Sequence, residues 1–126
     1  VPLYQPGKEG ATRIEFRAPD PACNPYLAFA VMLAAGLKGV EGKYRLSEPV
    51  EENIFQMTAA EKAKRGIGAL PGSLYAALEK LKGSALVRET LGAHLFEKFV
   101  ENKEIEWDNY RTHVSRYELT EYLPIL

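Results

Sequence analysis

The segment from Pro25 to about Lys38 limits what this chain can fold into more than any other stretch does. Its sequence, PYLAFAVMLAAGLK, carries apolar side chains on almost every side of the helix that it predicts, among them Leu27, Phe29 and Leu33. A helix that is apolar nearly all round has to be covered on most sides by other parts of a protein. We therefore expect this helix to lie buried.

The ends of this helix are marked by residues with known capping behaviour. Asn24 followed by Pro25 has the form of an N-cap with proline at the first helical position, and Gly36 and Gly39 are expected to end the helix. The longest apolar run, from Leu27 to Leu37, is about half as long as a membrane span requires. We expect a buried helix and no membrane partner.

A short run with a different period precedes the helix. RIEFR alternates charged and apolar residues, and residues two apart share one face of a strand. The charged side chains Arg13, Glu15 and Arg17 would then oppose Ile14 and Phe16. A single strand cannot stabilise itself, so we expect one or two N-terminal β-strands whose sheet partners lie elsewhere.

The charged face of this run allows two interpretations. It can be the solvated face of an exposed strand, for example one at a sheet edge. Alternatively, the two flanking arginines keep Glu15 ionised, so that Glu15 can bind a metal ion while Arg13 and Arg17 bind anions. Periodicity alone does not decide between them.

Most of the remaining chain has helical periodicity. Capping signals begin helices at Ser73, which is followed by a helix that stops at Gly83, at Ser84 before Gly92, and in the capping-box pairs Thr58 with Glu61 and Ser115 with Glu118. A long amphipathic helix is expected from Ala93 to about His113, with apolar residues at three- and four-residue steps. The fold class is therefore mostly α with one or two N-terminal β-strands.

Composition narrows the classes of function. Sixteen basic residues against seventeen acidic ones create no field that would recruit nucleic acid. The single cysteine, Cys23, forms no internal disulfide and no zinc-binding pair, which fits a reducing, cytoplasmic setting. We expect Cys23 to be a small buried apolar residue rather than a nucleophile.

The chain contains a set of short motifs: Arg13-Ile14-Glu15 with Arg17, Pro19-Asp20-Pro21, Asn24-Pro25-Tyr26-Leu27, LPGSL at 70–74, HLFEKF at 94–99 and EWDNYRTHVSRYE at 106–118. Together these motifs resemble one family, the type I glutamine synthetases. The resemblance implies a single C-terminal fragment, 1–126, of the α+β catalytic domain. Residues 1–22 would form a loop and an active-site strand, and residues 23–126 a helical region that ends in a C-terminal helical thong.

The same resemblance implies an ATP-dependent glutamate–ammonia ligase. In this family ATP phosphorylates the side-chain carboxylate of glutamate, and ammonia then displaces phosphate from γ-glutamyl phosphate to give glutamine. Two divalent metal ions, Mg²⁺ or Mn²⁺, and several arginines screen the repulsion between the nucleotide and the anionic substrate. The family also implies a cytoplasmic homo-oligomer, a dodecamer for the full-length enzyme.

Roles follow by resemblance for residues of the first segment. Glu15 matches a metal ligand on the nucleotide-phosphate side, Arg17 a catalytic residue that contacts the glutamate substrate and the transferring phosphoryl group, and Arg13 a residue near the ATP phosphates. The loop that contacts the nucleotide in this family corresponds to Gly10, Ala11 and Thr12, with Lys8 two positions earlier.

Two further expectations concern regulation and limits. Phe55 stands where some bacterial members carry an adenylylated tyrosine, so that route of regulation is closed at this position. The other metal ligands of the family lie upstream, so we expect this chain alone to lack ligase activity. The alternative hypothesis is a non-catalytic helical interaction and assembly module.

Overall fold

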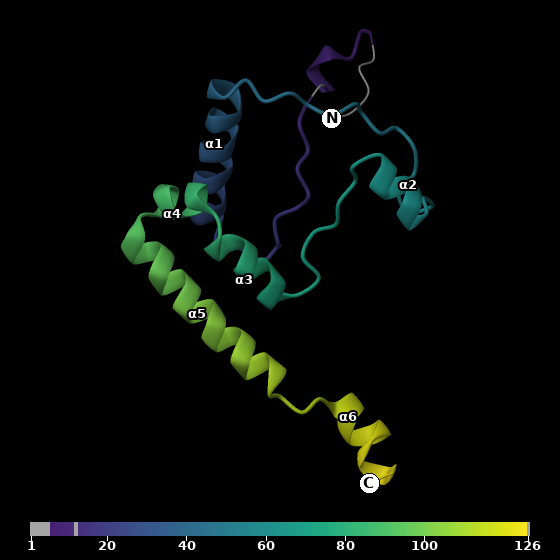
Figure 1. Cartoon of the computed structure of the whole chain (residues 1–126), viewed down its shortest axis with the longest axis vertical. Helices are drawn as coiled ribbons and strands as arrows, with labels where there is room; N and C mark the ends of the chain where they lie inside the picture. The colour runs from purple at the N-terminus through teal and green to yellow at the C-terminus, as the bar shows by residue number, and fades with distance from the viewer. Residues whose placement is uncertain (1–5, 12, 126) are drawn as a thin grey trace.

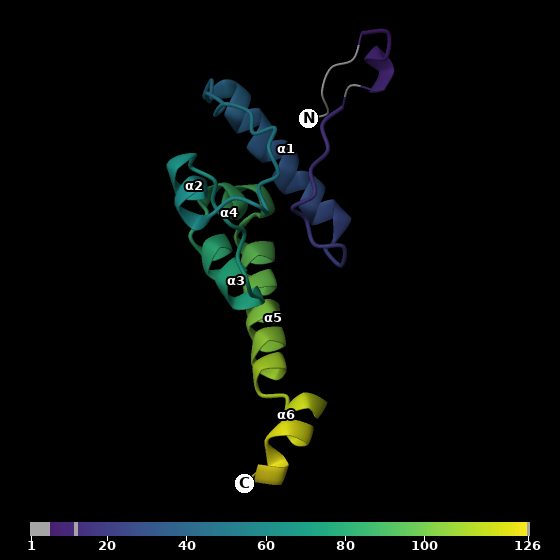
Figure 2. The ribbon, with the colours of Figure 1, turned by 90° about the vertical axis from the view of Figure 1, so that its right-hand side faces the viewer.

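The computed structural model describes residues 6–11 and 13–125, and its regular structure is helical. In chain order the elements are η1 (Glu9–Ala11), α1 (Pro25–Glu41), α2 (Ala59–Lys64), α3 (Leu74–Lys82), α4 (Ala85–Leu91), α5 (Ala93–Arg111), α6 (Arg116–Glu121) and η2 (Leu123–Ile125). Helices α1, α3, α4 and α5 form the packed part of the molecule (Figure 1). The C-terminal α6 lies beyond the end of α5, away from α1, in both views (Figures 1 and 2).

The expectation of one or two N-terminal β-strands is wrong for the described part of the chain. Residues 13–18 run without regular structure, and no strand occurs anywhere in residues 6–11 and 13–125. Backbone hydrogen bonds of a strand need a neighbouring strand, and the other described segments are helical or irregular. The sequence alternates charged and apolar residues here, but the described part of the chain contains no sheet to which this segment could pair.

Helix α1 begins as expected and ends later than expected. The Asn24 side chain accepts hydrogen bonds from the backbone N–H groups of Tyr26 and Leu27, and Pro25 occupies the first turn. Gly36 and Gly39 do not end the helix, because neither needs a left-handed backbone there and the residues between them are good helix formers. The helix ends at Gly42, where an added Cβ would lie 2.6 Å from the Tyr44 ring.

The other predicted caps are confirmed. Ser73 and Ser84 each accept a hydrogen bond from the backbone three residues on, and both capping boxes are complete. Hydrogen bonds from Thr58 lower the pKa of Glu61, and hydrogen bonds from Ser115 lower the pKa of Glu118. These interactions are local, which is why the sequence predicts them well.

A small core joins α3, α4 and α5. Among the described residues only Leu78 of α3 and Phe96 of α5 are buried, with 3% and 2% of their surface exposed. The guanidinium of Arg88 lies over the Phe96 ring, 4.2 Å from its centroid. Lys82 of α3 adds an ion pair to Glu104 of α5 at 2.5 Å. Phe96 is therefore the apolar centre on which three helices meet.

Helix α1 packs against α4 on one side and is uncovered on another, contrary to the expectation that it is buried. The exposed stripe follows three- and four-residue steps and consists of Tyr26, Phe29, Leu33, Leu37 and Val40. Cys23, just before the helix, is also exposed rather than buried. Nothing in the described part of the chain packs on the far side of α1, which is why both expectations fail.

The extent of this exposure is visible in the total surface. The chain exposes 11197 Å², whereas a compact monomer of 14.1 kDa exposes roughly 6,700 Å². The excess is several times the ~800 Å² that one partner contributes to a standard protein–protein interface. The tail contributes to this excess. Its exposed residues are Tyr117 and Leu119 of α6, the C-cap Tyr122, and Leu123 and Ile125 of η2.

Replacement of Phe96 by alanine tests whether this small core holds the helices together. Phe96→Ala removes the buried ring and should destabilise the fold by about 3–5 kcal/mol. We expect a clear fall in the midpoint of thermal unfolding, followed by helical circular dichroism. Phe55→Ala is the matched control, because Phe55 is 89% exposed and its loss should leave the midpoint unchanged. Equal midpoints for the two variants would contradict this account of the core.

Candidate functional site

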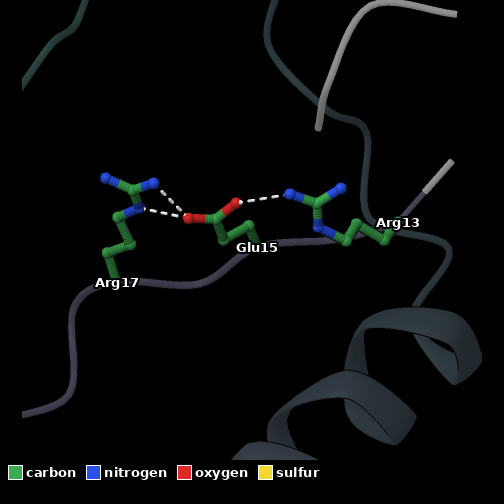
Figure 3. Close-up of polar contacts among 3 residues, drawn as sticks. All are labelled: Arg13, Glu15 and Arg17. Atoms are coloured by element: carbon green, nitrogen blue, oxygen red, sulfur yellow. Dashed lines mark hydrogen bonds and ion pairs between the residues drawn. The ribbon is translucent and has the colours of Figure 1, made fainter. Parts of the chain in front are cut away.

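Three charged side chains of the N-terminal segment form one ion-pair row (Figure 3). Arg13 donates from Nη2 to Oε2 of Glu15 at 3.3 Å. Arg17 donates from Nε to the other oxygen, Oε1, and its Nη2 forms an ion pair with that same oxygen. Each oxygen of the Glu15 carboxylate therefore faces a different guanidinium group.

The row is open to solvent, with the carboxylate as its most shielded member. The side chains of Arg13 and Arg17 are 62% and 84% exposed, whereas that of Glu15 is 38% exposed. Ion pairs in such surroundings contribute little to stability, because water and salt screen them. Dissolved cations and anions can therefore compete for these groups.

A tight turn connects the row to the first turn of α1. The Asp20 carboxylate accepts a hydrogen bond from the N–H of Ala22 at 2.7 Å, and the Asp20 carbonyl accepts one from the N–H of Cys23 at 3.0 Å. Asn24 then caps α1. The prolines Pro19 and Pro21 flank Asp20 and restrict the backbone on both sides. This turn sets the position of the charged row relative to the start of α1.

The predicted nucleotide loop lies directly before the row. Lys8 is exposed, and Gly10 belongs to the short helix η1. The N–H of Gly7 donates to Oε1 of Glu9 at 2.9 Å, and Gly7 has a φ of 80°, which favours glycine. Ala11 is the last residue of η1, and Thr12 lies outside the described residues. The roles of these residues stay predictions.

The described residues supply one candidate metal ligand rather than a complete site. The Glu15 carboxylate has the hard oxygen donors that Mg²⁺ and Mn²⁺ prefer. Across residues 6–11 and 13–125, no group of three or more histidine, cysteine, aspartate or glutamate side chains could hold a metal ion. His94 lies in the first turn of α5 and His113 just beyond its end, so neither joins Glu15. Further ligands would have to come from another part of a protein.

Reasoning from the sequence did not predict an apolar groove beside the turn. The groove has a volume of about 540 Å³ and lies between α1 and the helices α3 to α5. Its lining includes Cys23, Leu27, Leu74, Leu81 and Phe99. The sequence predicts the helix after Ser73, but not that this helix and α1 line one groove, which depends on contacts between distant segments.

Comparison with known proteins decides the family. The family model described as "Glutamine synthetase, catalytic domain" matches residues 1–122. The chain belongs to this family. The glutamine synthetase of Methanococcus maripaludis is 56% identical over 114 residues, which cover 90% of this chain and 26% of the relative. That of Mycolicibacterium smegmatis is 51% identical over 125 residues, which cover 99% of this chain and 28% of the relative.

These matches confirm the resemblance on which the glutamine synthetase interpretation rests and do not favour the alternative of a non-catalytic helical module. The chain spans about a quarter of the length of these relatives. In the part of the chain that the structure describes, no helix is long and apolar enough to cross a membrane.

The ion-pair row should contribute little to the stability of the fold, in contrast to Phe96 in the core. Glu15→Gln removes two exposed ion pairs, each of which contributes at most about 1 kcal/mol. We expect the thermal unfolding midpoint of this variant to lie close to that of the unaltered chain. A loss of stability comparable to that of Phe96→Ala would show that the row is structural.

Proposed function

We propose that this chain forms one wall of the active site of an ATP-dependent glutamate–ammonia ligase. The observation that carries the proposal is the arrangement of Arg13, Glu15 and Arg17 as a carboxylate between two guanidinium groups, in a chain of the glutamine synthetase family. Such a row offers one site for a cation and two for anions. The proposed reaction, glutamine formation through γ-glutamyl phosphate, needs both.

Glu15 is proposed to bind a divalent metal ion, Mg²⁺ or Mn²⁺, at the phosphates of ATP. Its donor chemistry fits one ligand position of such a site, and other parts of a longer catalytic domain would supply the remaining ligands. A bound divalent ion neutralises charge on the phosphates during transfer. The Glu15 carboxylate would supply one oxygen ligand to that ion, at the oxygens that now pair with Arg13 and Arg17.

The two arginines are proposed to bind anionic parts of the substrates. Arg17 contacts the glutamate substrate and the phosphoryl group in transfer, where a planar guanidinium can bind two oxygens at once. Arg13 contacts the ATP phosphates. The positive charge of both residues lowers the repulsion between the γ-phosphoryl group and the glutamate carboxylate that attacks it.

The preceding loop is proposed to contact the nucleotide through Lys8, Gly10, Ala11 and Thr12. The exposure of Lys8 and of Gly10 supports access to a ligand from solution. Backbone N–H groups in such a loop can bind phosphate oxygens, and a lysine adds a positive charge.

Assembly and regulation form a further part of the proposal. The exposed apolar residues of α6 and η2 support a helical thong that grips a second copy in a cytoplasmic homo-oligomer, a dodecamer for the full-length enzyme. Phe55 is exposed, and its backbone N–H donates a hydrogen bond of 3.1 Å to the side-chain oxygen Oδ1 of Asn53. Phe55 has no hydroxyl group, so adenylylation is closed at this position. Feedback by glutamine or by partner proteins would regulate the enzyme instead.

Replacement of Glu15 in a full-length glutamine synthetase that carries this segment tests the proposal. Glu15→Gln keeps the size of the side chain and removes its charge, so it should weaken metal binding and lower the rate of glutamine formation by at least about tenfold. The measurement is the rate as a function of Mg²⁺ or Mn²⁺ concentration. The matched control is Glu52→Gln, because Glu52 pairs with Arg65 at 2.8 Å outside the row.

The proposal is wrong if Glu15→Gln leaves the metal dependence of the rate unchanged. The chain alone provides a second check, since one carboxylate is too few for a specific metal site. We expect the purified 126-residue chain to form no glutamine from glutamate, ammonia and ATP.

A further inference from the structure

The exposed stripe of α1 has a spacing that is symmetric about its central residue. The stripe consists of Tyr26, Phe29, Leu33, Leu37 and Val40. Its steps along the sequence are three, four, four and three residues, so the same order of steps is met from either end. A repeat of three, four and four residues spans about three turns of an α-helix. The stripe therefore runs nearly parallel to the axis of α1.

The described part of the chain places no segment of its own over this stripe. Helix α1 packs against α4 with its other side, and α6 lies beyond the end of α5, away from α1, in both views (Figures 1 and 2). The exposed fractions of the five stripe residues lie between 53% and 82%. A continuous exposed apolar surface of this kind is typical of a protein–protein contact.

We propose that this stripe binds the same stripe of a second copy of the chain, with the two α1 helices antiparallel about a twofold axis at Leu33. In a twofold interface, residue i contacts residue j of the other copy and residue j contacts residue i. The symmetric spacing places Leu33 against Leu33 of the second copy. It also pairs Phe29 with Leu37. Tyr26 then meets Val40, so each aromatic ring packs on a smaller aliphatic side chain.

The charges of α1 favour this antiparallel arrangement over a parallel one. Glu41 is the last residue of α1, so in the antiparallel pair it lies beside the N-terminal end of the other helix. A carboxylate is stabilised there by the positive end of the helix dipole. A parallel pair would instead bring two Glu41 side chains and two negative helix ends together. Lys38 lies about a third of a turn away from Tyr26 around the helix, outside the stripe.

The stripe offers apolar surface on the scale of a specific interface. A buried aromatic side chain contributes about 150–250 Å², and Tyr26 and Phe29 supply two such side chains in each copy. The three aliphatic residues add to this area, toward the ~800 Å² that one partner contributes to a standard interface. The inference uses no residue of the ion-pair row, so its failure would leave the proposed function untouched.

A charged residue at the symmetry axis tests the interface. Size-exclusion chromatography with light scattering should show that the unaltered 126-residue chain approaches twice 14.1 kDa as its concentration rises. In Leu33→Glu two carboxylates would meet on the axis, so the mass should fall to 14.1 kDa. Helical circular dichroism should be kept, because Leu33 is 66% exposed. The matched control is Leu46→Glu, which should still dimerise, because Leu46 is 95% exposed and lies outside α1.

Oxidative cross-linking tests the direction of the two helices. The background is Cys23→Ser, which removes the exposed native thiol. In it, Leu33→Cys should form a disulfide-linked dimer, because the antiparallel pair brings position 33 next to itself. Phe29→Cys alone should form none. A mixture of Phe29→Cys chains with Leu37→Cys chains should form a mixed disulfide, because these two positions face each other across the axis.

Three results would overturn the inference. The first is an unaltered chain that stays at 14.1 kDa at every concentration, which would leave the stripe to another part of a longer protein. The second is a dimer that survives Leu33→Glu and is lost in Leu123→Glu, because the contact would then run through η2. The third is a disulfide-linked dimer of Phe29→Cys alone, which only a parallel pair of helices would give.

Discussion

The uncovered apolar face of α1 is the constraint on which the rest of the structure depends. A stripe from Tyr26 to Val40 faces solvent, while the opposite side of the helix packs on α4. Burial of apolar surface is the main favourable term in folding, at roughly 25 cal/mol per Å². A chain that leaves this much surface in water has little to set against the entropy of ordering its backbone. Partners that cover these faces would therefore add substantially to the stability of the chain.

The same constraint explains the state of the charged row. A row of alternating charges on a paired strand would have its backbone fixed and its apolar underside, Ile14 and Phe16, buried against a second layer. Here both apolar residues are exposed and the backbone is unpaired. The charged side chains of Arg13, Glu15 and Arg17 therefore satisfy one another. The candidate site and the packing of the chain are therefore incomplete for the same reason, which is that the described part of the chain lacks segments that would pack against them.

The parts of the structure that the sequence predicts are those set by neighbouring residues. The N-caps at Asn24, Ser73 and Ser84 and both capping boxes depend on hydrogen bonds within a few residues, and all are found. The C-terminal end of α1 was predicted less well, because glycine costs only about 1 kcal/mol inside a helix. Gly36 and Gly39 are therefore tolerated until the turn at Gly42.

The predictions that were wrong concern contacts between distant segments. A buried Cys23, a covered α1 and a paired strand at residues 13–17 all require partners that the described part of the chain does not provide. The residues of the candidate site were identified by the family pattern; the matches confirm the family, and the roles of these residues stay predictions. The mutual ion pairs of Arg13, Glu15 and Arg17 follow from spacing alone, since residues two apart share a side of an extended segment.

The central claim is that this chain has too little buried surface to form a compact unit by itself. Small-angle X-ray scattering with in-line size-exclusion chromatography tests it most directly, because it gives mass and radius of gyration together. A compact monomer of 126 residues has a radius of gyration of about 14 Å. The account predicts either a mass above 14.1 kDa, from self-association through the exposed apolar faces, or a monomer with a clearly larger radius. A monomer of 14.1 kDa with a radius of about 14 Å would contradict it.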